Sequence, residues 1–177
     1  MKLIISSAIC ICFYHESIYS LSVKSMDGRN VRMADFRNRK MLFVFIPLSM
    51  NDSTVSLEQL ASVQHKYDSS LVIIGIPVSE QDKAQEEKMR SAYQDFRQNF
   101  VLTETTTAKS ISSEKQNPLI AWLSHKEKNQ HFDYEWHGAG QKFFVDERGE
   151  LYATIGPEIK LSSSVVDQLL SKPRANK

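Results

Sequence analysis

Apolar and polar residues alternate with different periods along this chain, and each stretch predicts a secondary-structure element. Residues 18–25 alternate up to Asp27-Gly28, a dipeptide that is typical of a β-hairpin, with residues 31–33 as the returning strand. Residues 41–46 and 71–77 are continuously apolar, which predicts two strands that are buried on both faces.

Helical spacing follows both apolar runs. Polar residues at 51–54 are candidate N-caps for the first helix. The expected helices cover residues 57–67, 82–99, 119–126 and 165–170, and a second hairpin covers 142–146 and 150–155. A strand–helix–strand unit, then an antiparallel hairpin and a last helix, predicts an α/β protein of thioredoxin-like fold, with a mixed central sheet flanked by helices and an N-terminal β-hairpin.

The first 16 residues differ from the rest of the chain. Lys2 precedes an apolar run over residues 3–13, an order typical of a signal peptide, and the run is shorter than the ~20 residues that span a bilayer. The alternative is a buried N-terminal strand. We therefore expect a signal peptide at 1–16, one domain at 17–171 and a polar tail at 172–177, in an exported protein, either periplasmic or secreted.

Composition narrows the classes of function. The net charge is +1, and no basic block predicts a nucleic-acid partner. The chain has two cysteines, Cys10 and Cys12, both in the expected leader. No transmembrane segment and no cofactor are predicted. The sequence names neither an oligomeric state nor a partner, which is expected to be a small molecule or another protein.

Several short strings resemble landmarks of the glutathione peroxidase family, in the family's order and spacing, from about Ser17 to Leu170. They are residues 17–28, the strand 42–46 with its following loop, residues 74–77, Pro118-Leu119 before Trp122-Leu123, and residues 142–146 before Gly149. The resemblance implies a thioredoxin-like fold of the glutathione peroxidase type. It also implies an oxidoreductase family that acts in oxidative stress.

The family's chemistry is peroxide reduction by a cysteine or selenocysteine, whose thiolate or selenolate attacks the peroxide. Ungapped alignment on these landmarks places Asn51 at the cysteine position. The family's glutamine falls on Glu80, with Gln81 beside it, and its tryptophan–asparagine pair falls on Gly138 and Ala139. All four family positions have therefore changed, and no catalytic residue is predicted.

Neighbouring residues do not restore this chemistry. Met50 carries a thioether, which has no thiolate form. A two-residue shift brings Trp136 to the tryptophan position but puts His137 at the asparagine position. The resemblance thus implies a pseudoenzyme that is inactive as a thiol peroxidase and serves as a binding or interaction module. A residual peroxidase role remains an alternative if a leader cysteine is retained.

Two further alternatives rest on the segment 131–137. If it is extended, alternate residues face one side, and a metal-assisted enzyme could use His131, Asp133, Glu135 and His137 as ligands. The alternative without a function is a solvated loop. Exposed Tyr134 and Trp136 could instead form a docking patch of a passive structural protein. Loss of the family's indole at Gly138 further predicts a pocket floored by Met50 and Trp136.

Overall fold

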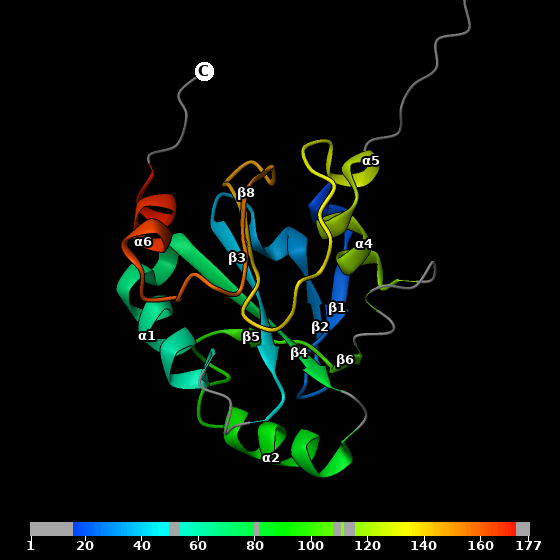
Figure 1. The fold of residues 1–177 in the computed structure, drawn as a ribbon, viewed down its shortest axis with the longest axis vertical. Helices are drawn as coiled ribbons and strands as arrows, with labels where there is room; N and C mark the ends of the chain where they lie inside the picture. The colour runs from blue at the N-terminus through cyan, green and yellow to red at the C-terminus, as the bar shows by residue number, and fades with distance from the viewer. Residues whose placement is uncertain (1–15, 50–53, 80–81, 108–110, 112–115, 173–177) are drawn as a thin grey trace, which may run out of the picture.

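A mixed β-sheet forms the centre of the computed structural model, which describes residues 16–49, 54–79, 82–107, 111 and 116–172 (Figure 1). Its strands follow the order β5-β4-β3-β7-β8, and β6 also pairs with β4. The bounds are β3 (Lys40–Pro47), β4 (Leu71–Ser79), β5 (Val101–Leu102), β6 (Thr106–Thr107), β7 (Lys142–Val145) and β8 (Leu151–Ile155). The predicted signal peptide, save for Glu16, and the tail beyond residue 172 lie outside the described residues.

Strand β3 is the middle of the sheet because both of its faces are apolar. It pairs in parallel with β4, from Lys40 opposite Leu71 to Pro47 opposite Val78, and antiparallel with β7. Alternate β3 side chains enter two different hydrophobic clusters: Phe43 and Phe45 enter one, and Leu42 and Val44 enter the other. The continuous apolar run therefore predicted the strand and its burial correctly.

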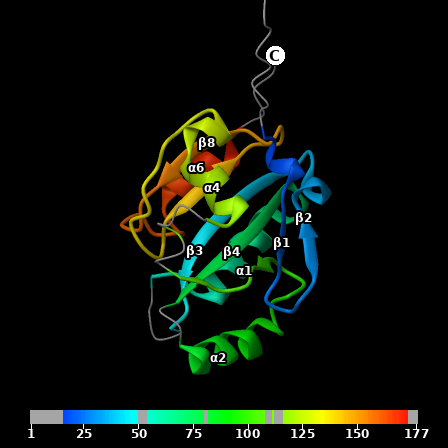
Figure 2. The same ribbon diagram turned by 90° about the vertical axis from the view of Figure 1, so that its right-hand side faces the viewer.

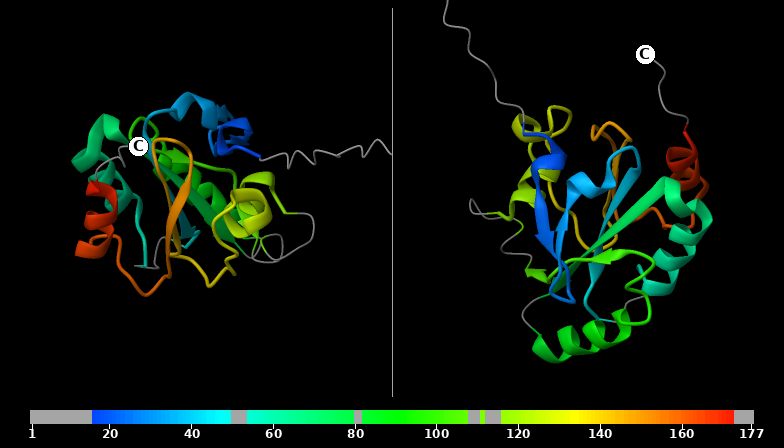
Figure 3. Two further views of the ribbon diagram at one scale, coloured as in Figure 1. Left: turned by 90° about the horizontal axis from the view of Figure 1, so that it is seen from above. Right: turned by 180° about the vertical axis from the view of Figure 1, so that it is seen from behind.

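Helices cover both faces of the sheet. Figure 3 shows α1 (Leu57–Tyr67) and α6 (Ser164–Ser171) on one side and α4 (Pro118–Ser124) on the other, with α5 (Lys126–Asn129) following α4. Helix α2 (Lys83–Tyr93) lies beyond the carboxyl ends of β3 and β4 (Figure 1). Short 3-10 helices span Ile18–Ser20, Met33–Phe36 and Asp68–Ser70. The predicted α/β architecture is confirmed.

The cap of α1 and the end of α2 differ from the prediction. Helix α1 covers the predicted residues 57–67, but its N-cap is Ser56, which forms a capping box with Gln59, and not the candidate Thr54; the candidates at 51–53 lie outside the described residues. Helix α2 ends at Tyr93 instead of continuing to residue 99. The Tyr93 hydroxyl donates to the Phe100 carbonyl and accepts from the Leu102 N–H, so residues 94–99 turn back toward the sheet.

The predicted N-terminal hairpin forms a separate two-stranded sheet of β1 (Ser22–Lys24) and β2 (Asn30–Arg32) (Figure 2). Its turn contains Gly28 at φ +86°, a left-handed conformation that favours glycine. The hairpin is fixed to the main sheet by the Met26 N–H, which donates to the Leu102 carbonyl over 2.7 Å.

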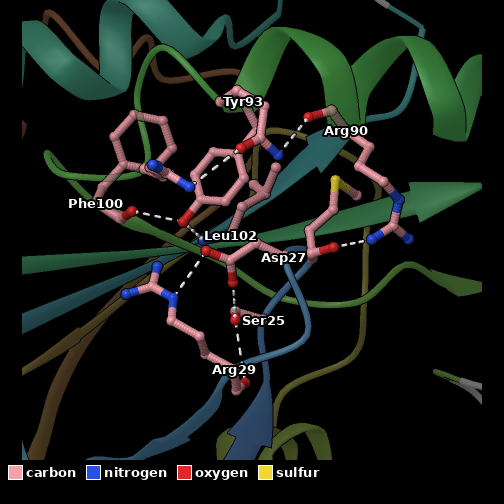
Figure 4. A network of polar contacts seen from close by, with 10 residues as sticks. Ser25, Asp27, Arg29, Arg90, Tyr93, Phe100 and Leu102 are labelled. Carbon is pink, nitrogen blue, oxygen red and sulfur yellow. Dashed lines mark hydrogen bonds and ion pairs between the residues drawn. The ribbon is translucent and has the colours of Figure 1, made fainter.

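A polar network reinforces this attachment (Figure 4). Arg29 Nε donates to the Asp27 carboxylate at 2.8 Å, and the Ser25 hydroxyl contacts the same carboxylate. The Arg90 guanidinium of α2 donates to the Met26 carbonyl. The network therefore joins the hairpin turn to α2 and, through Tyr93, to β5. None of the helices in the described part of the chain is both long and apolar enough to cross a membrane.

Candidate functional site

The candidate site lies at the carboxyl end of β3, where the loop before β7 meets the sheet. The Gly140 N–H donates to the Phe45 carbonyl at 2.6 Å, and the Phe45 N–H donates to the Gln141 carbonyl at 2.9 Å. Because β3 and β4 are parallel, the segments that follow them leave the same edge of the sheet. Those segments contain Met50, Asn51, Glu80 and Gln81, which lie outside the described residues.

Two glycines, Gly138 and Gly140, determine the backbone conformation of the loop before β7. Gly138 has φ +123° and Gly140 has φ +94°, values that residues with a Cβ rarely adopt. A Cβ on Gly138 would meet nothing within 4 Å, so the space beside it is open. A Cβ on Gly140 would lie 2.7 Å from Thr54 Cγ2 and 3.2 Å from Pro157 Cβ. The backbone of the loop therefore favours glycine at both positions, and any side chain at Gly138 would be strained by its φ although it has room.

Two buried polar side chains hold this loop in place. The Gln141 side-chain oxygen accepts the His137 N–H at 2.7 Å. Lys142 is 1% exposed, and its Nζ donates to the carbonyls of Gly140 and Ile159, the second at 2.6 Å. Burial lowers the pKa of Lys142 to about 8, although the nearby Glu158 carboxylate acts in the opposite direction. Sequence reasoning missed both anchors, and their only signal was two polar residues at the start of an apolar strand.

Trp136 lies against the core, two residues before Gly138. Its ring makes an edge contact with Phe45, with the centroids 6.5 Å apart, and its indole N–H is buried without a hydrogen-bond partner among the described residues. Trp136 lines a pocket with Tyr134 and residues at the end of α4, but Gly138 is not in its lining, so this is not the pocket expected from a missing indole. Met50, the other expected floor residue, is outside the described residues.

The candidate metal ligands do not converge. No group of three or more His, Cys, Asp or Glu side chains that could hold a metal ion occurs in the part of the chain that the structure describes, which includes residues 131–137. The Asp133 carboxylate accepts the Lys126 N–H at 2.8 Å, the His137 ring packs against Tyr134, and the His131 ring packs beside Phe132.

The segment begins with a turn. The Asn129 side chain accepts the N–H groups of His131 and Phe132, at 2.7 and 2.9 Å, and Gln130 has φ +65°. After the turn, exposure alternates over 133–137, with Asp133, Glu135 and His137 exposed and Tyr134 and Trp136 half-buried. The alternative of a solvated loop fits the four candidate ligands, since His131 is exposed as well.

Solved structures with a similar backbone show the fold. The crystal structure of T. cruzi GPX1 has a TM-score of 0.61 at 15% identity, covering 88% of this chain and 95% of that chain. A thiol:disulfide interchange protein of the thioredoxin family from Chlorobium tepidum TLS has a TM-score of 0.59 at 17% identity, covering 88% and 94%. The chain thus has a thioredoxin-like fold of the glutathione peroxidase type.

Sequence comparison identifies the family. Glutathione peroxidase 2 of Sapajus apella is 27% identical over 127 residues, which are 68% of this chain and 67% of that protein. Glutathione peroxidase 2 of Homo sapiens is 27% identical over 120 residues, so the match spans 64% of this chain and 63% of that relative's length. The family model for glutathione peroxidase matches residues 18–124, more than half of the chain. This chain therefore belongs to the glutathione peroxidase family.

Proposed function

We propose that this protein is a glutathione peroxidase-like protein that has lost the thiol peroxidase site and acts as a non-catalytic binding or interaction module. The observation that carries the proposal is the position of its cysteines. The chain contains only Cys10 and Cys12, and Asn51 stands where the family's nucleophile aligns. An amide is no substitute, because the peroxide-reducing species of this chemistry is a thiolate or selenolate.

The residues aligned with the rest of the family's site also support the loss of peroxidase chemistry. Glu80 would put a carboxylate next to any thiolate, and like charges disfavour each other. At Gly138 the backbone itself, with φ +123°, disfavours the tryptophan that the family carries. The proposal therefore concerns the whole site, and not a single tolerated substitution.

A peroxidase assay on the full chain tests the proposal directly. We expect no consumption of hydrogen peroxide or of an organic hydroperoxide above the buffer blank, with glutathione or with thioredoxin as reductant. The control is the double variant Cys10→Ser/Cys12→Ser. Turnover that persists in the double variant would refute the loss of peroxidase chemistry, and turnover that disappears there would establish the alternative in which a leader cysteine acts.

The variant Asn51→Cys tests whether the site is altered beyond its nucleophile. We expect no recovery of turnover, because Glu80, Gly138 and Ala139 still replace the residues that stabilise the family's anion. The matched control is Ser49→Cys, which adds a thiol just after β3 at a position that does not align with the nucleophile. Recovery in Asn51→Cys alone would contradict the proposal that the surrounding site has been lost.

Export is a separate part of the proposal. The order of Lys2 and the apolar residues 3–13 supports a cleaved leader, after which the mature chain would contain no thiol. The intact mass of the protein recovered from its producing cell measures this. A mass that includes residues 1–16 would refute cleavage.

A further inference from the structure

A pocket next to the loop of the candidate site has a distinctive lining. It lies between the carboxyl end of α4 and the segment 134–136, and has a volume of about 340 Å³. That volume is within the range of small-molecule sites, which begin at about 300 Å³. The described lining residues are Ile111, Gln116, Ser124, His125, Tyr134, Glu135 and Trp136. None of them is one of the four altered family positions.

The charge of this lining favours a cation. Glu135 carries a negative charge, and no lysine or arginine is among the described lining residues. The Gln116 side chain is engaged with its neighbours, since its oxygen lies 3.0 Å from His125 Nε2 and its amide nitrogen donates to the Ile111 carbonyl. The Ser124 carbonyl at the end of α4 is already occupied by the Tyr134 N–H at 2.8 Å, which fixes the two walls relative to each other. An anion entering here would meet the Glu135 carboxylate without a described cationic partner.

The aromatic walls favour an organic cation over a bare ion. Tyr134 and Trp136 both line the pocket, and each is held by an edge contact with a buried phenylalanine, Phe143 for the first and Phe45 for the second. Tryptophan and tyrosine rings attract ammonium groups through their negative faces. Ile111 supplies an apolar surface for the stem of a ligand.

We propose that this pocket binds a free small molecule that carries an alkylammonium group, with the cation at Glu135 and the aromatic rings. The inference goes beyond the proposed function and does not depend on it, since the peroxidase positions are not part of the pocket. A failure to bind cations would leave the peroxidase assays unchanged, and peroxidase turnover would leave the pocket unchanged.

Comparing choline with its neutral isostere 3,3-dimethyl-1-butanol separates the contribution of ligand charge to binding from that of ligand shape. We expect calorimetric titration of the full chain to detect choline binding, with the isostere at least about fivefold weaker, the size of one cation–π or charge contribution. Intrinsic fluorescence gives a second readout. The chain has two tryptophans, and since Trp122 is 1% exposed, a change on titration reports Trp136.

Glu135→Gln is the decisive variant because its side chain is exposed, so the fold should not depend on it. We expect it to weaken choline binding about fivefold and to leave the weak binding of the isostere unchanged. The matched control Glu87→Gln removes an exposed carboxylate on α2 and should leave choline binding unchanged.

Three results would overturn the proposal. They are equal binding of choline and the isostere, no binding of choline, and equal weakening by Glu87→Gln and Glu135→Gln. A response to phosphatidylcholine vesicles without a response to free choline would also overturn it, because it would assign the ammonium group to a lipid headgroup.

Discussion

The hairpin network and the loop before β7 attach irregular segments to the same sheet in different ways. In the network, two α2 side chains join the helix to its neighbours: Arg90 bonds the Met26 carbonyl of the hairpin turn, and Tyr93 bonds the Phe100 carbonyl and the Leu102 N–H at β5 (Figure 4). The loop relies on glycine conformations at Gly138 and Gly140 and on carbonyl groups that receive one buried ammonium. Side chains bond to backbone groups in both attachments, but the loop also depends on left-handed glycine conformations.

The residues of the hairpin network and those of the proposed site are different sets. The parallel pair of β3 and β4 and the hairpin network contain none of Asn51, Glu80, Gly138 and Ala139, so these attachments do not depend on the proposed site positions. A fold does not by itself imply its usual activity. Variants in each attachment should therefore lower the free energy of unfolding by different amounts.

The largest expected effect is at the loop glycine that has no room for a side chain. Gly140→Ala should lower the free energy of unfolding by about 3 kcal/mol, since it adds a left-handed backbone cost to a clash with Thr54 and Pro157. Gly138→Ala, with open space around the new Cβ, should cost about 1–2 kcal/mol from the backbone alone. Denaturant unfolding measures both, and equal costs would show that the close contacts at Gly140 do not matter.

Removal of one hydroxyl tests the network. Tyr93→Phe should cost about 2 kcal/mol, because the buried Phe100 carbonyl and Leu102 N–H both lose their partner. Tyr152→Phe is the control: its hydroxyl makes one bond, to the Leu169 carbonyl at 3.0 Å, and its loss should cost about 1 kcal/mol. A larger loss for Tyr152→Phe in urea unfolding would be inconsistent with the central role of Tyr93.

The buried ammonium of the loop predicts a dependence on pH. Because the pKa of Lys142 in the folded protein is about 8, below the ordinary 10.5, the unfolded chain binds more protons between these values. Stability should therefore rise with pH from about 8 toward 10, by about 2 kcal/mol. Lys142→Met should lose most of this rise. Lys40, whose pKa burial also lowers, acts in the same direction, and Tyr93 and Tyr152, whose pKa values burial raises, act against it. Denaturant unfolding at several pH values measures this rise in stability. If the free energy of unfolding of Lys142→Met rose with pH as steeply as that of the parent, the rise could not be assigned to Lys142.

The smallest effect belongs to the carboxylate of the network. Burial acts to raise the pKa of Asp27, but hydrogen bonds from Ser25 and Arg29 and the charge of Arg29 outweigh it, so the pKa lies below its ordinary value. Asp27→Asn should cost about 1 kcal/mol at neutral pH, and the difference from the parent should shrink as pH falls below about 4.

The control for this variant is Asp35→Asn, which breaks an exposed ion pair with Arg32 and should change stability by roughly 0.5 kcal/mol or less. Thermal unfolding at neutral and acidic pH compares the two variants. A cost for Asp27→Asn that stays constant down to acidic pH would show that the charge of the carboxylate makes no contribution.

The sequence by itself determined the strands, the family and the absence of a cysteine after Cys12. Continuous apolar runs predict β3 and β4 because such runs need burial on both faces, and Asp27-Gly28 predicts a turn because its conformation is local. These features depend on neighbouring residues, which a linear pattern contains.

Only the tertiary structure decided the end of α2, the shape of the loop before β7 and the pocket at Glu135. Each depends on partners distant in sequence: Tyr93 with Leu102, Gly140 with Phe45, and Trp136 with the end of α4. The candidate ligands His131, Asp133, Glu135 and His137 form no metal-binding group although exposure alternates over 133–137, because alternation along a segment does not by itself bring side chains together around one point. Contacts of this kind have no period along the chain, and so no pattern of residues predicts them.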